Sequence, residues 1–82
     1  MTTYMVIETF LHGPDPVYER FERQGRMLPE GLEYIDSWLT EDRRRCFQLM
    51  RTKDRSLFEK WIRHWKDLVE FEIIALGEKP RS

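Results

Sequence analysis

The chain has 82 residues and a formal net charge of -1; 35% of its residues are charged and 13% are aromatic. A chain of this length predicts one domain, and the aromatic content is typical of a folded core, which excludes a disordered protein. Acidic and basic residues nearly balance, so we expect no nucleic-acid partner. The single cysteine, Cys46, cannot form an internal disulfide, and this favours a reducing, cytoplasmic location.

The first part of the chain predicts a strand followed by a helix. Residues 4–10 are rich in β-branched and aromatic side chains, which favour a strand. This apolar stretch is short and contains Glu8, so we expect neither a signal peptide nor a membrane span. Asp15 followed by Pro16 is typical of a helix start, and the helix is expected to run to about Arg26.

The second part predicts two strands, a helix and a last strand. The strands over residues 33–40 and 45–51 are joined by a short polar loop, residues 41–43. A helix over residues 54–68 carries apolar side chains at helical spacing, and residues 69–76 form the fourth strand. We therefore expect a single domain over residues 1–76 and a C-terminal tail over residues 77–82.

The order β-α-β-β-α-β predicts an α+β fold, a ferredoxin-like sandwich. In that fold a four-stranded antiparallel sheet has the strand order 4-1-3-2, and both helices lie on one face. The other face has no helix to cover it.

Side chains alternate across each strand, so each strand contributes two sets. We expect the helices to cover the set Met5, Ile7, Ile35, Leu39, Phe47, Leu49, Phe71 and Ile73. The open face then holds Tyr4, Val6, Glu8, Phe10, Tyr34, Asp36, Trp38, Cys46, Gln48, Met50, Glu70, Glu72, Ile74 and Leu76. A three-residue loop would pair Trp38 with Cys46 and Asp36 with Gln48. A bare face of this kind exceeds the ~400 Å² that soluble surfaces tolerate, so we expect a homodimer through it.

Several segments resemble a known family. They are Tyr-Met-Val-Ile-Glu-Thr-Phe at residues 4–10, Val-Tyr-Glu-Arg-Phe at 17–21, Arg-Met-Leu-Pro-Glu-Gly-Leu-Glu-Tyr-Ile-Asp-Ser-Trp at 26–38, Arg-Cys-Phe-Gln-Leu-Met at 45–50 and Trp-Lys-Asp-Leu-Val-Glu-Phe-Glu-Ile at 65–73. The family consists of small bacterial proteins of unknown function and resembles the dimeric α/β-barrel superfamily. That superfamily includes monooxygenases, lactone isomerases and heme-degrading enzymes, so the resemblance implies a dimer without choosing a reaction.

Glu8 is the candidate catalytic residue. A carboxyl in the middle of a central strand is costly to bury unless it is paired or protonated. We expect burial, together with Glu70 or Glu72 on the neighbouring strand, to raise its pKa and make it a general acid or base. The structural alternative is a hydrogen bond from Gln48, a tyrosine hydroxyl or an arginine of a partner chain.

The expected pocket lies between the two sheets of a dimer. Tyr34 and Trp38 would supply flat walls, and Asp36, Gln48 and Glu72 would orient a ligand. The alternative is that these side chains are interface contacts alone. No His or Cys lies at ligand spacing from another, so we expect no metal and no cofactor.

Two functions remain open from the sequence. The first is a homodimer that binds a small, largely apolar molecule between its sheets, as an isomerase or a cofactor-independent monooxygenase. The second is a non-enzymatic regulatory or interaction module, in which the open face serves association alone.

Overall fold

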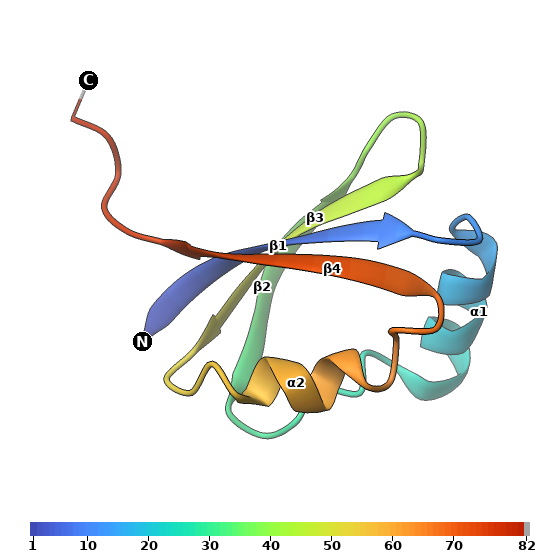
Figure 1. Ribbon diagram of the computed structural model, residues 1–82, viewed down its shortest axis with the longest axis horizontal. Coiled ribbons are helices and arrows are strands. Elements are labelled where there is room, and N and C mark those ends of the chain that lie inside the picture. Colours follow the sequence, from blue (N-terminus) through green and yellow to red (C-terminus); the bar gives the residue numbers. More distant parts are fainter. Residues whose placement is uncertain (82) are drawn as a thin grey trace.

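The computed structural model describes residues 1–81 and has six elements in the predicted order (Figure 1). They are β1 (Thr2–Phe10), α1 (Asp15–Gln24), β2 (Leu32–Leu39), β3 (Arg45–Thr52), α2 (Leu57–Ile62) and β4 (Val69–Leu76). The strands form one antiparallel sheet in the order β2-β3-β1-β4, so β1 and β3 are central. The predicted α+β, ferredoxin-like fold is confirmed.

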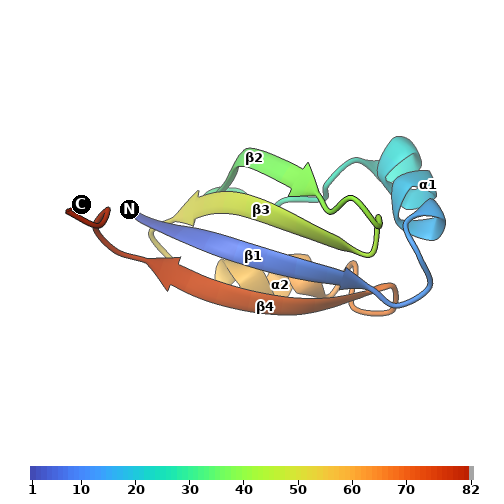
Figure 2. The same cartoon turned by 90° about the horizontal axis from the view of Figure 1, so that it is seen from above.

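The two helices take different positions relative to the sheet. α2 lies against the middle of one face, whereas α1 lies at the end of the sheet where β1 ends (Figures 1 and 2). The α-helical part of α2 has only six residues, fewer than predicted. Tight turns continue to Leu68, because the N–H groups of Trp65 and Leu68 donate to carbonyls three residues earlier.

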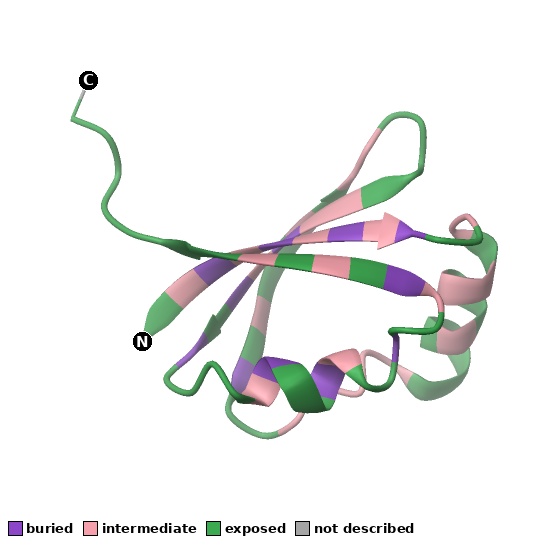
Figure 3. Cartoon of the chain, in the orientation of Figure 1, coloured by how far each residue is buried: buried purple, intermediate pink, exposed green. Residues whose placement is uncertain are grey.

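The core lies between the sheet and α2. Tyr4 and Phe58 pack edge to face with ring centroids 5.0 Å apart, and Trp61 packs in the same way on Phe71 at 5.1 Å. The buried apolar side chains are Tyr4, Val6, Phe10, Leu32, Met50, Phe58, Trp61, Trp65 and Val69. Alternation along β1 is visible in Figure 3, where buried and intermediate residues follow one another.

The predicted assignment of the two faces was therefore wrong for β1 and β3. Tyr4, Val6, Glu8 and Phe10, with Cys46, Gln48 and Met50, lie on the face covered by the helices, and Met5, Ile7, Phe47 and Leu49 lie on the open face. Both sets contain large apolar side chains, so alternation along the strands predicts two faces but does not show which of them the helices cover. The helices cover the set that contains Tyr4, because the Tyr4 ring packs against Phe58 of α2. For β4 the prediction was right, since Phe71 and Ile73 pack against the core.

The hairpin between β2 and β3 shifts the predicted register. Its loop has four residues, since the N–H of Thr40 donates to the carbonyl of Arg45. Asp42 organises this loop by accepting bonds from the Thr40 hydroxyl and the Arg44 N–H, while Arg43 takes a positive φ of 62°. Trp38 consequently pairs with Phe47 rather than with Cys46, and Asp36 pairs with Leu49 rather than with Gln48.

A β-bulge between Tyr34 and Asp36 changes the alternation within β2. Leu32, Tyr34 and Leu39 lie on the covered side, as their register partners Thr52, Met50 and Cys46 do. Ile35 lies at the bulge and is exposed, so its predicted place under the helices was wrong, whereas that of Leu39 was right.

The open face carries both apolar and acidic side chains, as predicted, although most of its residues differ from those expected. Its most exposed large side chains are Trp38, Ile74 and Leu76, and Met5, Ile7, Phe47 and Leu49 are half-buried. Neither helix within residues 1–81 reaches the length and apolar content that crossing a bilayer requires.

Candidate functional site

A pocket of about 270 Å³ opens between the covered face of the sheet and the two helices. Its lining residues come from every element and are Glu8, Phe10, Val17, Tyr18, Phe21, Arg26, Ser37, Leu39, Cys46, Gln48, Trp61, Trp65 and Val69. Most of them are apolar or aromatic, and a few polar groups converge among them, as is typical of small-molecule sites. The volume corresponds to about nine water molecules.

Glu8 is the carboxyl of this pocket. It lies near the end of β1, where its backbone pairs with Cys46 on β3 and Phe71 on β4, and only 9% of its surface is exposed. Burial raises the pKa of Glu8 from 4.5 to about 7, against the lowering effects of a contact with the Cys46 thiol and of the positive charge of Arg26. The carboxyl is therefore close to half-protonated at neutral pH.

The predicted like-charge contribution to the pKa of Glu8 was wrong. Glu70 and Glu72 pair with Thr9 and Ile7, so they belong to the open face, on the other side of the sheet from Glu8. The predicted desolvation remains, and it is the largest cause of the shift.

The Cys46 thiol lies between Glu8 and Ser37 of β2. Burial and the neighbouring Glu8 raise the pKa of the thiol to about 11, and a contact with Ser37 opposes this. The Ser37 Oγ in turn lies 2.6 Å from the Tyr34 Oη. At neutral pH the thiol stays protonated, so it is a poor nucleophile.

Gln48 lies in the pocket beside Glu8 and is buried. Its amide Nε2 donates to the Met50 Sδ at 3.2 Å, a bond that fixes the orientation of the amide. The expected interaction with Asp36 does not form, because Asp36 lies on the open face, where its Oδ1 accepts the N–H of Ser37 at 2.8 Å.

Arg26 brings a positive charge to the pocket. α1 ends at Gly25, whose φ of 69° and bond to the Phe21 carbonyl turn the chain toward the sheet. The backbone carbonyl of Arg26 accepts both indole N–H groups, from Trp61 at 3.0 Å and Trp65 at 3.1 Å. Its guanidinium lies 3.6 Å from the centroid of the Tyr34 ring. These contacts hold the residue after the helix in a defined position.

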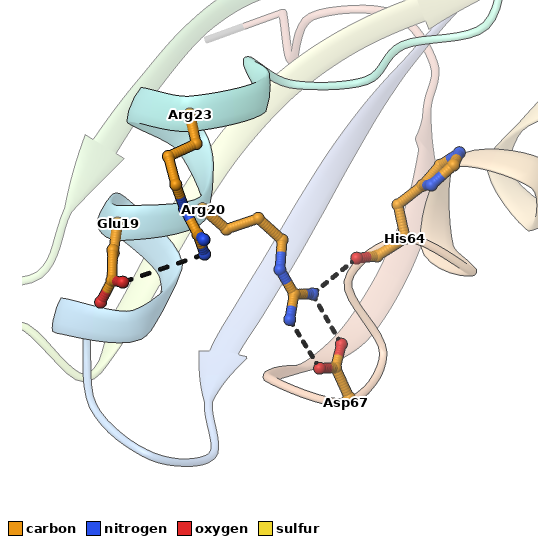
Figure 4. A network of polar contacts seen from close by, with 5 residues as sticks. All are labelled: Glu19, Arg20, Arg23, His64 and Asp67. Atoms are coloured by element: carbon orange, nitrogen blue, oxygen red, sulfur yellow. Dashed lines mark hydrogen bonds and ion pairs between the residues drawn. The ribbon is translucent and has the colours of Figure 1, made fainter.

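An ion pair links α1 to the turn before β4 (Figure 4). Arg20 donates two parallel bonds to Asp67, each 2.8 Å long, and a third to the carbonyl of His64. The contact with Arg20 lowers the pKa of Asp67 to about 2. No residue of α1 is buried, although Val17, Tyr18 and Phe21 line the pocket.

The structure brings together some of the predicted site residues and separates others. Glu8 and Gln48 line the pocket. Tyr34 is not among the lining residues, but its hydroxyl is hydrogen-bonded to Ser37, which is. Asp36, Trp38 and Glu72 lie on the open face. A chamber between two sheets therefore cannot contain all six residues.

Sequence reasoning missed Arg26 and Ser37 as pocket residues. Arg26 lies in a connecting segment with no periodic pattern, and the only signal was the preceding glycine. Ser37 lies on the covered face because it pairs with Gln48 and alternates with Leu39, two residues further along β2. Trp61 and Trp65 were expected in the core, where they are, and they also form a wall of the pocket.

The pocket has no metal-binding arrangement. Within residues 1–81, no three His, Cys, Asp or Glu side chains come together in a way that could hold a metal ion. The chemistry available is that of a carboxyl, a thiol, an amide and a guanidinium against aromatic walls.

These features define a small ferredoxin-like protein with a pocket between its sheet and its helices. The chain belongs to the family described as "Domain of unknown function (DUF3303)", which matches residues 2–78. The predicted membership of a family of unknown function is thereby confirmed. No curated protein and no solved structure matches the chain. The ferredoxin-like fold of the chain is confirmed, whereas the relation to dimeric α/β-barrel proteins and the dimer stay predictions.

Proposed function

We propose that this protein binds a small, largely apolar molecule in the pocket under its helices and that Glu8 transfers a proton to or from it. This is the chemistry of an isomerase or of a cofactor-independent monooxygenase. The observation that supports it is a nearly buried carboxyl with a pKa of about 7 on the wall of an apolar pocket. A general acid or base works best when its pKa lies near the working pH.

The neighbours of Glu8 suit this role. The protonated Cys46 thiol supplies a donor that orients the carboxyl, and the Gln48 amide offers its oxygen and remaining N–H to a ligand. The Trp61 and Trp65 rings supply apolar walls that exclude water. We place the binding site inside one subunit, rather than between two sheets as the sequence suggested.

Proton exchange with solvent tests the proposal. Quinones, lactones and polyketide-like compounds are first screened by thermal shift. Compounds that bind are then followed by NMR in D2O for deuterium incorporation at carbon. We expect exchange that Glu8→Gln abolishes while leaving binding intact, and that the open-face control Glu72→Gln leaves unchanged. Binding without Glu8-dependent exchange would favour the non-enzymatic regulatory module, and the absence of any binding would remove the proposed site.

We further propose that the open face is covered by a second copy of the chain. Trp38 is 51% exposed there, and Ile74 and Leu76 are 40% and 39% exposed. Exposed apolar side chains that gather on one face of a sheet mark association surfaces. Sedimentation at micromolar concentration should show a dimer that Trp38→Glu converts to monomers. The control Leu11→Glu, at an exposed apolar residue just after β1, should leave the dimer intact. A monomeric wild-type protein would contradict this proposal.

A further inference from the structure

We infer that the ligand is an organic anion and that the Arg26 guanidinium binds its carboxylate or enolate oxygen. This inference rests on the proposed function and narrows its substrate class. The ligand would have an apolar body against the indole wall and one negatively charged group at Arg26, next to the carboxyl that exchanges the proton.

The stacking of Arg26 leaves its donors available. The guanidinium carbon lies 3.6 Å from the centroid of the Tyr34 ring and 4.9 Å from that of Phe21. Stacking occupies the flat faces of the group, while its N–H bonds point outward in its plane. Among residues 1–81, the side chain of Arg26 forms no ion pair within 4.0 Å and donates no hydrogen bond. A half-buried arginine with open N–H groups is suited to a planar oxyanion.

The charge balance of the pocket points to the same ligand. Glu8 and Arg26 are the only charged side chains among the lining residues. When Glu8 is protonated, Arg26 carries an uncompensated positive charge beside aromatic walls of low polarity. An anion neutralises this charge, whereas a neutral ligand leaves it unpaired.

Arg26 is also held in place before any ligand arrives. Both indole N–H groups bind its backbone carbonyl, so Trp61 and Trp65 fix the residue whatever its side chain does. A preorganised donor loses little entropy on binding. The same bonds make substitution of the side chain a fair test, because the variant keeps the contacts made by the backbone.

Anion binding should be coupled to proton uptake. Glu8 faces Cys46 of β3, Arg26 of the segment after α1 and Tyr18 of α1, while β4 and α2 present the apolar Phe71 and Trp61. A bound anion beside Glu8 disfavours its charged form and draws Arg26 away from it. The affinity for an anion should therefore fall as the pH rises through about 7.

The experiment compares two probes of the same shape, phenylacetate and phenylacetamide. Trp38→Phe removes the open-face indole, so the fluorescence of Trp61 and Trp65 reports the pocket alone. We expect phenylacetate to bind roughly tenfold more tightly than the amide below pH 7, as one charge-assisted bond allows. In this background Arg26→Gln should abolish the preference and Arg26→Lys should retain part of it, while the exposed control Arg23→Gln should leave it unchanged.

The outcomes separate this inference from the proposed function. Equal affinity for the two probes, or a preference that survives Arg26→Gln, would overturn the anion assignment and leave the pocket as a binding site for neutral molecules. Tight binding of phenylacetate without proton uptake, measured by calorimetry in buffers of different ionisation enthalpy, would overturn the coupling to Glu8. The lack of saturable quenching by either probe would overturn both the inference and the proposed pocket.

Discussion

The two faces of the sheet are built from the same strands and differ in what lies opposite them. On the covered face Val6 and Met50 are fully buried, and Glu8 is nearly buried. On the open face Ile7 is half-buried and Glu72 is exposed. The same residue type thus meets two environments, and burial is the largest cause of the raised pKa of Glu8.

The largest effect should come from removing a core side chain. Met50→Ala deletes a fully buried side chain on the covered face and should lower the free energy of unfolding by about 2–5 kcal/mol at every protein concentration. Leu49→Ala, one residue along on the open face, should cost less in dilute protein, and its cost should grow with concentration if the proposed dimer forms. Urea denaturation at two concentrations measures both. Equal costs for the two variants in dilute protein would contradict the face assignment.

The second effect is the pH dependence that Glu8 gives to stability. Its pKa is raised in the folded state, so the folded protein binds more protons than the unfolded chain between pH 4.5 and about 7. Stability should therefore fall by about 3 kcal/mol as the pH rises through this window. Glu8→Gln should remove this slope and make the protein more stable above pH 7.

Denaturation curves at several pH values provide the measurement. Glu72→Gln, on the open face, is the matched control and should keep the wild-type slope. A slope that persists in Glu8→Gln would assign the titration to another group.

The smallest effect concerns thiol reactivity. Cys46, with a pKa of about 11, should react slowly with iodoacetamide at neutral pH, and its rate should rise about tenfold per pH unit until the thiolate predominates. Thr9→Cys in a Cys46→Ser background, assayed at a protein concentration too low for dimerisation, places a thiol on the open face beside Arg45. It should react on the order of a hundredfold faster, since an ordinary thiol has a pKa of about 8.5. Mass spectrometry follows both rates, and similar rates would contradict the shielding of Cys46.

Much of the fold could be predicted from local signals. The bounds of β4, the strand order and the place of Trp61 and Trp65 in the core follow from alternation, helical spacing and chirality. Glu8 could be singled out because burying a carboxyl in a central strand is costly unless the group is paired or protonated. The expected burial and raised pKa of Glu8 are found, although the cavity beside it is a different one and its catalytic role stays a prediction.

The rest depends on tertiary contacts that no local pattern records. Either face of β1 could have met the helices, and ring packing by Tyr4 and Phe58 decides between them. A loop of four residues rather than three moved Asp36 away from Gln48. The turn at Gly25 brings Arg26 to the pocket. The position of this residue therefore depends on where α1 packs against the rest of the molecule.

The attachment of α1 has a consequence for the rates at which a ligand of the proposed pocket would enter and leave. The segment forms one side of the pocket, and an ion pair joins its Arg20 to Asp67, whose side chain is 58% exposed. Mobile ions screen such a pair and leave the aromatic core unaffected. Added salt should therefore speed both entry and escape of a bound molecule while the melting of the sheet stays where it was.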